Sequence, residues 1–270
     1  MSLRINTNVE AFNAHRNLQG TESKLAMSME RLSSGYRINR AADDAAGLAI
    51  SERLKSQIGG LDQAQRNAQD AVSLVQTAEG SLDQVHAMLQ RIRDLAVEYK
   101  NGTLSSQDQT AIQSEINQLA SEIQRIGTTA QFNGIPLLNG QVTITFQVGA
   151  NDGETIEVTT ATLFGSAIPT AAFALSSTSN VDISEIDAAI DGVSSLRANY
   201  GAVQNRLEHV ANNLGVYQEN LTASESQIRD VDMASEMANL TKLQVLQQAG
   251  TSMLAQANQL PQSVLSLLRG

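Results

Sequence analysis

Three histidines are the residues best suited to chemistry in this sequence, and they do not form a motif. His15, His86 and His209 are far apart along the chain, and no HExxH pair, glycine-rich phosphate loop or supported Ser-His-Asp order accompanies them. The absence of cysteine removes thiolate and disulfide chemistry. The sequence therefore predicts no catalytic residue, no cofactor site and no metal ligand, and we do not expect an enzyme.

The charge balance argues against two classes of partner. The chain has 270 residues, with 18 Lys and Arg against 28 Asp and Glu, and a net charge of -10. Nonspecific nucleic-acid binding and docking on an anionic membrane both need basic patches, so we expect neither. The N-terminus, MSLRINTNVEAF, lacks the apolar run of a secretory signal. We therefore expect a cytosolic protein or one exported by another route.

The segment from Leu243 to Leu268 contains no ionisable side chain. Its apolar residues recur every three or four positions, which predicts a helix with a wide apolar face. A bilayer span is not expected, because the segment's many amide side chains would need hydrogen-bond partners in the hydrocarbon. We expect this helix to pack with the N-terminal segment and with other copies of the chain. The N-terminal segment has two shorter apolar stripes: Ile5, Val9 and Phe12, then Leu25, Met29 and Leu32.

The middle of the chain has the most regular apolar spacing. Runs from Ile50 to Tyr99, from Ile112 to Ile126 and from Ile186 to Val231 keep a three-four repeat, which predicts three long helices packed along coiled-coil-like seams. Ser106 with Gln109 resembles a capping box for the second helix, and Asp182 is the expected N-cap of the third. The seam residues that we expect to be buried are Leu61, Val75, Leu82, Leu89, Leu207 and Leu214.

The fold class that follows is mainly α. We expect an elongated antiparallel helical bundle with one small β-hairpin region, plus paired N- and C-terminal coiled-coil-like helices. The hairpin is expected at about 141–160, where apolar and polar residues alternate on either side of the turn GANDG, and a short loop at 161–181 follows it. The expected domains are a terminal one (1–40 and 235–270) and a bundle domain (41–234).

Five motifs then give a resemblance to a known family. LSSGYRINRAADDAAGLAIS (32–51), QRIRDLAVE (90–98), FNGIPLLNG (132–140), FQVGANDGETI (146–156) and MLAQANQLPQSVLSLLR (253–269) occur in the order found in bacterial flagellins. The resemblance covers roughly residues 1–160 and 180–270. Only about 20 residues stand where many flagellins have large variable outer domains, so the chain resembles a short-form flagellin.

The resemblance implies a structural subunit that self-assembles into the extracellular flagellar filament used for swimming. In the family the terminal segments are disordered in the monomer, leave the cell unfolded through the flagellar type III channel, and pair as helices in the filament core. The residues that we expect to pack there are Ile5, Val9, Phe12, Leu254, Leu260, Val264 and Leu267.

The resemblance also implies partners. They are other flagellin subunits, an export chaperone on the segment from about Met237 onward, the filament cap, and the hook-associated junction proteins. Arg91, Leu95 and Glu115 match family positions that bind toll-like receptor 5 of vertebrate hosts, although they could simply be exposed bundle residues that pack in the filament. Two other functions stay open: a hook–filament junction protein, and a flagellin acting mainly as a soluble signalling ligand.

Overall fold

The computed structural model describes residues 8–164, 168 and 183–269, with side chains up to Gln259. Its helices are α1 (Val9–Ser34), α2 (Ala45–Tyr99), α3 (Ser106–Thr129), α4 (Ile183–Arg229) and α5 (Met233–Arg269). Its strands are β1 (Gln131–Phe132), β2 (Ile135–Pro136), β3 (Thr143–Gln147) and β4 (Thr155–Thr159). The predicted fold class, a mainly helical chain with a small hairpin region and paired terminal helices, is confirmed.

The chain divides into two compact units. The terminal unit comprises residues 1–56 and 220–270, and the bundle unit comprises residues 57–219. Helices α2 and α4 are each continuous through this division. The division therefore falls inside these two helices, and the domain boundaries expected from the sequence, near residues 40 and 235, stay a prediction.

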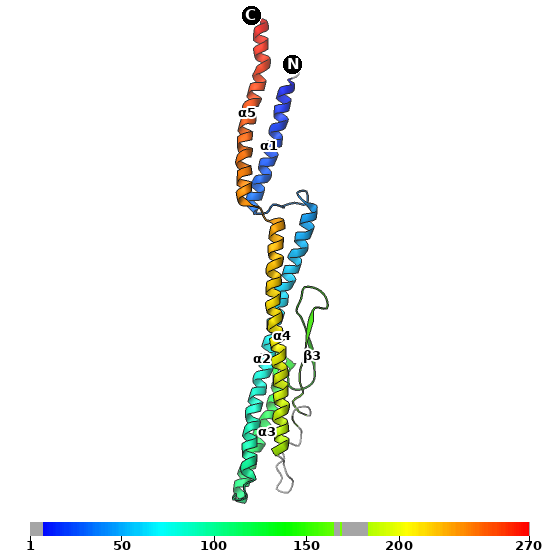
Figure 1. The fold of residues 1–270 in the computed structure, drawn as a ribbon, viewed down its shortest axis with the longest axis vertical. Helices are drawn as coiled ribbons and strands as arrows, with labels where there is room; N and C mark the ends of the chain where they lie inside the picture. The colour runs from blue at the N-terminus through cyan, green and yellow to red at the C-terminus, as the bar shows by residue number, and fades with distance from the viewer. Residues whose placement is uncertain (1–7, 165–167, 169–182, 270) are drawn as a thin grey trace. The chain divides into compact units, whose positions relative to one another are not determined.

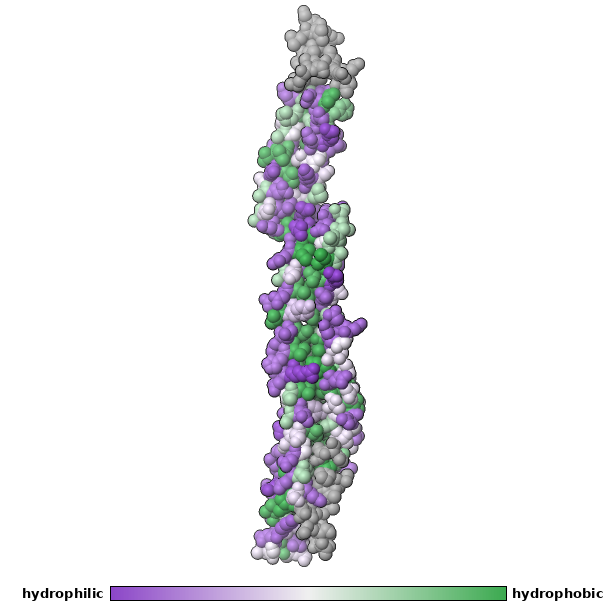
Figure 2. All heavy atoms as spheres, turned by 45° about the vertical axis from the view of Figure 1, so that its right-hand side comes forward, coloured by the Kyte–Doolittle hydropathy of each residue, from purple (hydrophilic) through white to green (hydrophobic). Residues whose placement is uncertain are grey.

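The bundle unit is held together by one continuous apolar core. Within it α3 and α4 lie alongside α2 and run antiparallel to it (Figure 1). The three-four spacing of α2 turns its apolar side chains to one side, where they join those of α3, α4 and the hairpin. Figure 2 shows apolar side chains gathered in a line between hydrophilic ones on one face. The seam residues inferred from the sequence are all buried: Leu61, Val75, Leu82, Leu89, Leu207 and Leu214.

The start of α3 differs from the expected one by a single residue. The hydroxyl oxygen of Ser105 accepts a hydrogen bond from the Asp108 amide (3.2 Å), and the Asp108 carboxylate accepts one from the Ser105 amide (3.1 Å). The hydroxyl and amide of Ser105 lower the pKa of Asp108. The expected box of Ser106 and Gln109 is wrong, because the chain is still extended at Ser105 and Ser106 is already helical.

The hairpin forms where it was predicted and docks on the helices of its unit. β3 and β4 pair antiparallel, with Phe146 opposite Ile156, and Gly153 takes the left-handed backbone (φ 85°) that the turn requires. The Asn67 side chain of α2 donates a hydrogen bond to the Gln147 carbonyl (2.9 Å). The Tyr200 hydroxyl of α4 accepts one from the Ala161 amide (3.2 Å), and burial raises the pKa of Tyr200.

The third predicted helix corresponds to α4. α4 begins at Ile183, so its expected N-cap, Asp182, lies outside the described residues. α4 ends at Arg229, two residues before the expected Val231, because the chain turns there to connect with α5. Most of the loop expected at 161–181 also lies outside the described residues, although Leu163 and Ile168 are described and buried.

Replacing Leu207 with Asp tests the bundle core. Leu207 is fully buried, so an unpaired carboxylate there should destabilise the bundle by more than about 4 kcal/mol. The matched control is Val216→Asp on the same helix, where the side chain is 60% exposed and the expected change is within about 0.5 kcal/mol. Thermal unfolding followed by circular dichroism measures both. A Leu207→Asp variant that melts like the control would contradict the seam assignment.

Candidate assembly surface

Helices α1 and α5 pack against each other as an antiparallel pair in the terminal unit (Figure 1). On each helix the positions shielded from solvent alternate at spacings of three and four, the pattern of a coiled-coil seam. On α1 these positions are Ala11, Ala14, Leu18, Thr21, Leu25 and Ser28. On α5 they are Glu236, Leu240, Leu243, Gln247, Gly250, Leu254 and Ala257.

Small and polar side chains occupy much of this seam. A Cβ added at Gly250 would lie 3.3 Å from the Cδ1 atom of Leu18, so the absence of a side chain there allows a close approach. The Asn8 side chain caps α1 by accepting from the Ala11 amide (3.1 Å) and donates to the Ala257 carbonyl of α5 (2.7 Å). Near the other end of α1, the buried Ser28 hydroxyl donates to the Glu236 carboxylate. Polar contacts therefore fix the pair where apolar ones are few.

The segment that follows α1 is hydrogen-bonded to the segment that connects α4 with α5. α1 ends at Ser34, and the left-handed backbone of Gly35 after it (φ 76°) lets the Gly35 amide donate a hydrogen bond to the Arg31 carbonyl (2.9 Å). The Gly35 carbonyl accepts from the Val231 amide (3.0 Å), and the Arg37 amide donates to the Arg229 carbonyl (2.6 Å). The segment after α1 and the segment after α4 are thus joined by backbone bonds.

Arg229 strengthens this junction. Its guanidinium lies 4.7 Å from the centroid of the Tyr36 ring and forms an ion pair with Glu52 (2.7 Å). Its side chain is only 16% exposed, so both contacts are partly shielded from water. Asp43 organises the next turn by accepting from the amides of Arg40 and Asn39, and these bonds lower the pKa of its carboxyl.

The helix pair leaves most of its large apolar side chains in solvent. Among the described residues fifteen large apolar side chains are exposed, and eleven of them lie in the terminal unit. The described parts of α1 and α5 bury only two apolar residues, Leu243 and Ala257. Burial of one large apolar side chain contributes about 1.5–3 kcal/mol. Burying the exposed ones in an interface would therefore stabilise that interface strongly. A surface of this kind is typical of a protein–protein interface.

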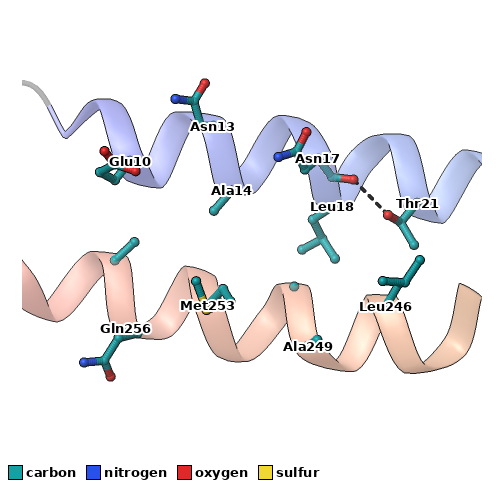
Figure 3. Close-up of a pocket in the computed structure, with 12 residues that line it drawn as sticks. Glu10, Asn13, Ala14, Asn17, Leu18, Thr21, Leu246, Ala249, Met253 and Gln256 are labelled. Atoms are coloured by element: carbon teal, nitrogen blue, oxygen red, sulfur yellow. Dashed lines mark hydrogen bonds between the residues drawn. The ribbon is translucent and has the colours of Figure 1, made fainter.

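An apolar groove of about 600 Å³ runs beside the seam (Figure 3). Leu18 of α1 and Leu246 of α5 point toward the opposite helix. Along α5, Met253 lies between Leu246 and Gln256. Asn13 and Asn17 of α1 also line the groove. The groove therefore combines a small apolar floor with amide groups that can form hydrogen bonds.

The expected filament-core residues fall into three groups. Val9 and Phe12 are exposed, by 56% and 69%, and Leu254 is half-buried on the α1–α5 seam. Ile5, and the side chains of Leu260, Val264 and Leu267, lie outside the described residues.

The apolar stripes read from the sequence located the seam between the terminal helices only in part, because Leu25 and Leu243 lie on it and several neighbouring stripe residues do not. Met29 is exposed, and the seam passes through Ser28; Leu246 and Met253 are likewise exposed beside the α5 seam. The missed signal was the three-four spacing of Ala11, Ala14 and Leu18, which only a search that includes small residues would find.

The three expected receptor-contact residues do not share one exposed surface. Arg91 and Glu115 form an exposed ion pair (2.8 Å) between α2 and α3. Leu95 is only 2% exposed and belongs to the bundle core, because it sits on the inner side of α2 beside Ile92 and Ala96. The alternative that all three are exposed bundle residues is therefore wrong for Leu95.

Neither a metal-ligand cluster nor a helix suited to span a membrane occurs among the described residues. In the part of the chain that the structure describes, no three His, Cys, Asp or Glu side chains gather closely enough to hold a metal ion. No helix in the same part is both long and apolar enough to cross a membrane.

Two family descriptions match most of the chain. The bacterial flagellin N-terminal helical region matches residues 5–143, and the bacterial flagellin C-terminal helical region matches residues 183–268. The first match includes α1, α2 and α3, and the second includes nearly all of α4 and α5. Both partners of the α1–α5 pair thus lie in matched regions.

Similar proteins match over nearly their whole length. A flagellin of Halalkalibacterium halodurans is 54% identical over 270 residues, covering 98% of this chain and 99% of that protein. A flagellin of Bacillus subtilis is 46% identical over 304 residues, covering 99% and 100%. The flagellar filament 33 kDa core protein of Treponema phagedenis is 46% identical over 284 residues, covering 98% and 99%.

Two solved structures share the fold. The crystal structure of Bacillus cereus flagellin is 31% identical, with a TM-score of 0.50, and covers 55% of this chain and 88% of that one. A putative flagellar hook-associated protein of Vibrio parahaemolyticus has a TM-score of 0.60 at 16% identity, covering 70% and 100%. At that identity the second likeness concerns the fold alone.

Proposed function

The chain belongs to the bacterial flagellin family, and on that premise we propose that it polymerises through its α1–α5 pair into the filament that drives swimming. Flagellins are structural proteins, so the chain is a filament component and not an enzyme. The observation that supports the proposed surface is the concentration of exposed apolar side chains in the terminal unit.

Most of the exposed large apolar side chains lie in the terminal unit, where further burial is still available. The bundle unit has a complete core, and only four large apolar side chains of its described residues are exposed: Val97, Val142, Val216 and Tyr217. The α1–α5 pair can bury its exposed apolar side chains only against another surface. A copy of the same pair offers a matching one, and no ionisable side chain from Leu243 to Leu268 would be desolvated there.

Export and handling before assembly belong to the same proposal. The subunit leaves the cell unfolded through the flagellar type III channel and acts in the extracellular flagellum, beside the cap and the hook-associated junction proteins. The marginal burial within α1 and α5 supports terminal helices that are disordered in the monomer, because isolated helices are weakly stable in water. An export chaperone on the segment from Met237 onward would cover exposed residues such as Val245 and Leu246.

Replacing Phe12 with Asp tests the assembly surface. Phe12 is 69% exposed, so the substitution should leave the melting of the bundle unit unchanged and reduce filament growth at least tenfold. Burying the new carboxylate at an interface would cost several kcal/mol. The matched control is Gln19→Asp, which adds the same charge seven residues later on α1, where an exposed polar side chain already stands.

The measurement is growth from short filament seeds in ammonium sulfate, which strengthens apolar association, followed by electron microscopy. Long filaments from the unmodified protein support a filament subunit, whereas short stubs favour the hook–filament junction alternative. Normal growth of Phe12→Asp would place the interface elsewhere.

A second candidate function is recognition by toll-like receptor 5, through the exposed ion pair of Arg91 and Glu115. Leu95 would support this contact indirectly, because its buried side chain fixes the α2 turn that carries Arg91. The same contact would serve a flagellin that acts mainly as a soluble signalling ligand, the other function left open by the sequence.

Alanine at Arg91 should reduce activation of receptor-bearing cells by the monomer at least tenfold, by removing a charge from the proposed contact. Arg66→Ala is the control, since Arg66 forms a similar exposed pair with Asp62 on α2. Equal activity of the two variants would rule out this contact.

A further inference from the structure

The methionines of this chain are distributed unevenly between the two units. The sequence contains seven, and five of them (Met27, Met29, Met233, Met237 and Met253) are exposed in the terminal unit, by 44 to 65%. Met88 in the bundle unit is half-buried against the core, and Met1 lies outside the described residues. Among the described residues, accessible thioethers are therefore concentrated on the α1–α5 pair.

These five side chains border the seam between the two helices. Met27 and Met29 stand on either side of the buried Ser28, and Met237 follows Glu236, which accepts the Ser28 hydroxyl. Met233 lies one helical turn before Met237. Met253 lines the apolar groove together with Leu18 and Leu246 (Figure 3). A chemical change at these methionines would alter both flanks of the proposed assembly surface.

Few other side chains in the chain would compete for an oxidant. The sequence has no cysteine and no tryptophan, so thioether sulfur is the most readily oxidised group that it contains. Met88 is shielded by its packing against the bundle core. Oxidation of the free subunit should therefore fall first on the five exposed methionines.

We propose that the methionines bordering the α1–α5 seam form a modification site, at which oxidation to the sulfoxide by hydrogen peroxide blocks assembly reversibly. This inference rests on the proposed function, and it adds a chemical control of the same surface. The assembled filament would bury these side chains, so the free subunit is the sensitive form.

The reaction is an oxygen-atom transfer. A lone pair of the thioether sulfur attacks one oxygen of hydrogen peroxide, so a sulfur–oxygen bond forms while the oxygen–oxygen bond breaks. The proton on the transferred oxygen passes to the departing hydroxide, giving the sulfoxide and water. Sulfur loses two electrons, and the peroxide gains them.

The physical consequence follows from the polarity of the product. A flexible apolar side chain that adapts to an uneven interface becomes a polar, chiral one. Its new oxygen accepts hydrogen bonds from water, which it would lose on entering an apolar interface. Several sulfoxides on one helix pair should therefore weaken association together, while the bundle core keeps its composition.

The experiment treats purified full-length monomer with hydrogen peroxide, removes the peroxide, and measures growth from untreated filament seeds. Peptide mass spectrometry counts the added oxygen at each methionine. We expect addition at the five exposed methionines before Met88, a growth rate at least tenfold lower, and an unchanged melting curve of the bundle unit. Incubation with both methionine sulfoxide reductases, one for each sulfoxide epimer, and dithiothreitol should restore growth.

A variant with all five methionines replaced by leucine supplies the matched control. Its growth after peroxide is compared with its own growth before peroxide, and a ratio near one is expected. A ratio as low as that of the original protein would show that other groups are responsible.

The inference is overturned if the fully oxidised protein extends seeds at the untreated rate, if the five methionines resist peroxide, or if the reductases restore nothing. Untreated protein that fails to extend seeds would overturn the proposed function instead, and this inference with it.

Discussion

The unequal division of apolar burial between the two units is the constraint on which the rest of the structure depends. Along α2 of the bundle unit, apolar residues at three-four spacing reach a core shared with α3 and α4. Along α1 and α5 the same spacing carries leucines interrupted by alanine, glycine, serine and other small or polar residues, and many larger apolar side chains remain exposed outside the seam. The bundle unit buries its apolar side chains within the chain, whereas the terminal unit leaves many of its large ones exposed.

The polar contacts of the terminal unit compensate for its limited apolar burial. A pair of helices with little apolar burial gains specificity from contacts such as Asn8 to Ala257 and Ser28 to Glu236. The backbone bonds between the two connections, with Arg229 packed on Tyr36, bring the ends of α1 and α5 together and lower the entropy cost of pairing them. In the proposed assembly, the charge-free segment supplies exposed apolar side chains such as Val245 and Leu246 for packing against further copies.

The sequence predicted the parts of the fold in which side-chain size and spacing agree. The bundle seam and the hairpin were of this kind, because leucine and isoleucine mark a buried position clearly and the GANDG turn marks a reversal. The α1–α5 seam was predictable only in part, since small or polar residues stand between its leucines and the apolar residues beside it face solvent. Leu95 shows a further limit, because matching a family motif gives a position but not its burial. The family itself was predictable, because five ordered motifs span both ends of the chain.

Hydrogen exchange of monomer and filament tests the central claim most directly. The account predicts that amides of α1 and α5 around Leu18 and Leu243 exchange quickly in the monomer and at least a hundredfold more slowly in the filament. Amides of α2 and α4 around Leu82 and Leu207 should be protected in both states, because their core is complete in the monomer. Equal protection of all four helices in the monomer would contradict the account, since the terminal pair would then be stable without a partner.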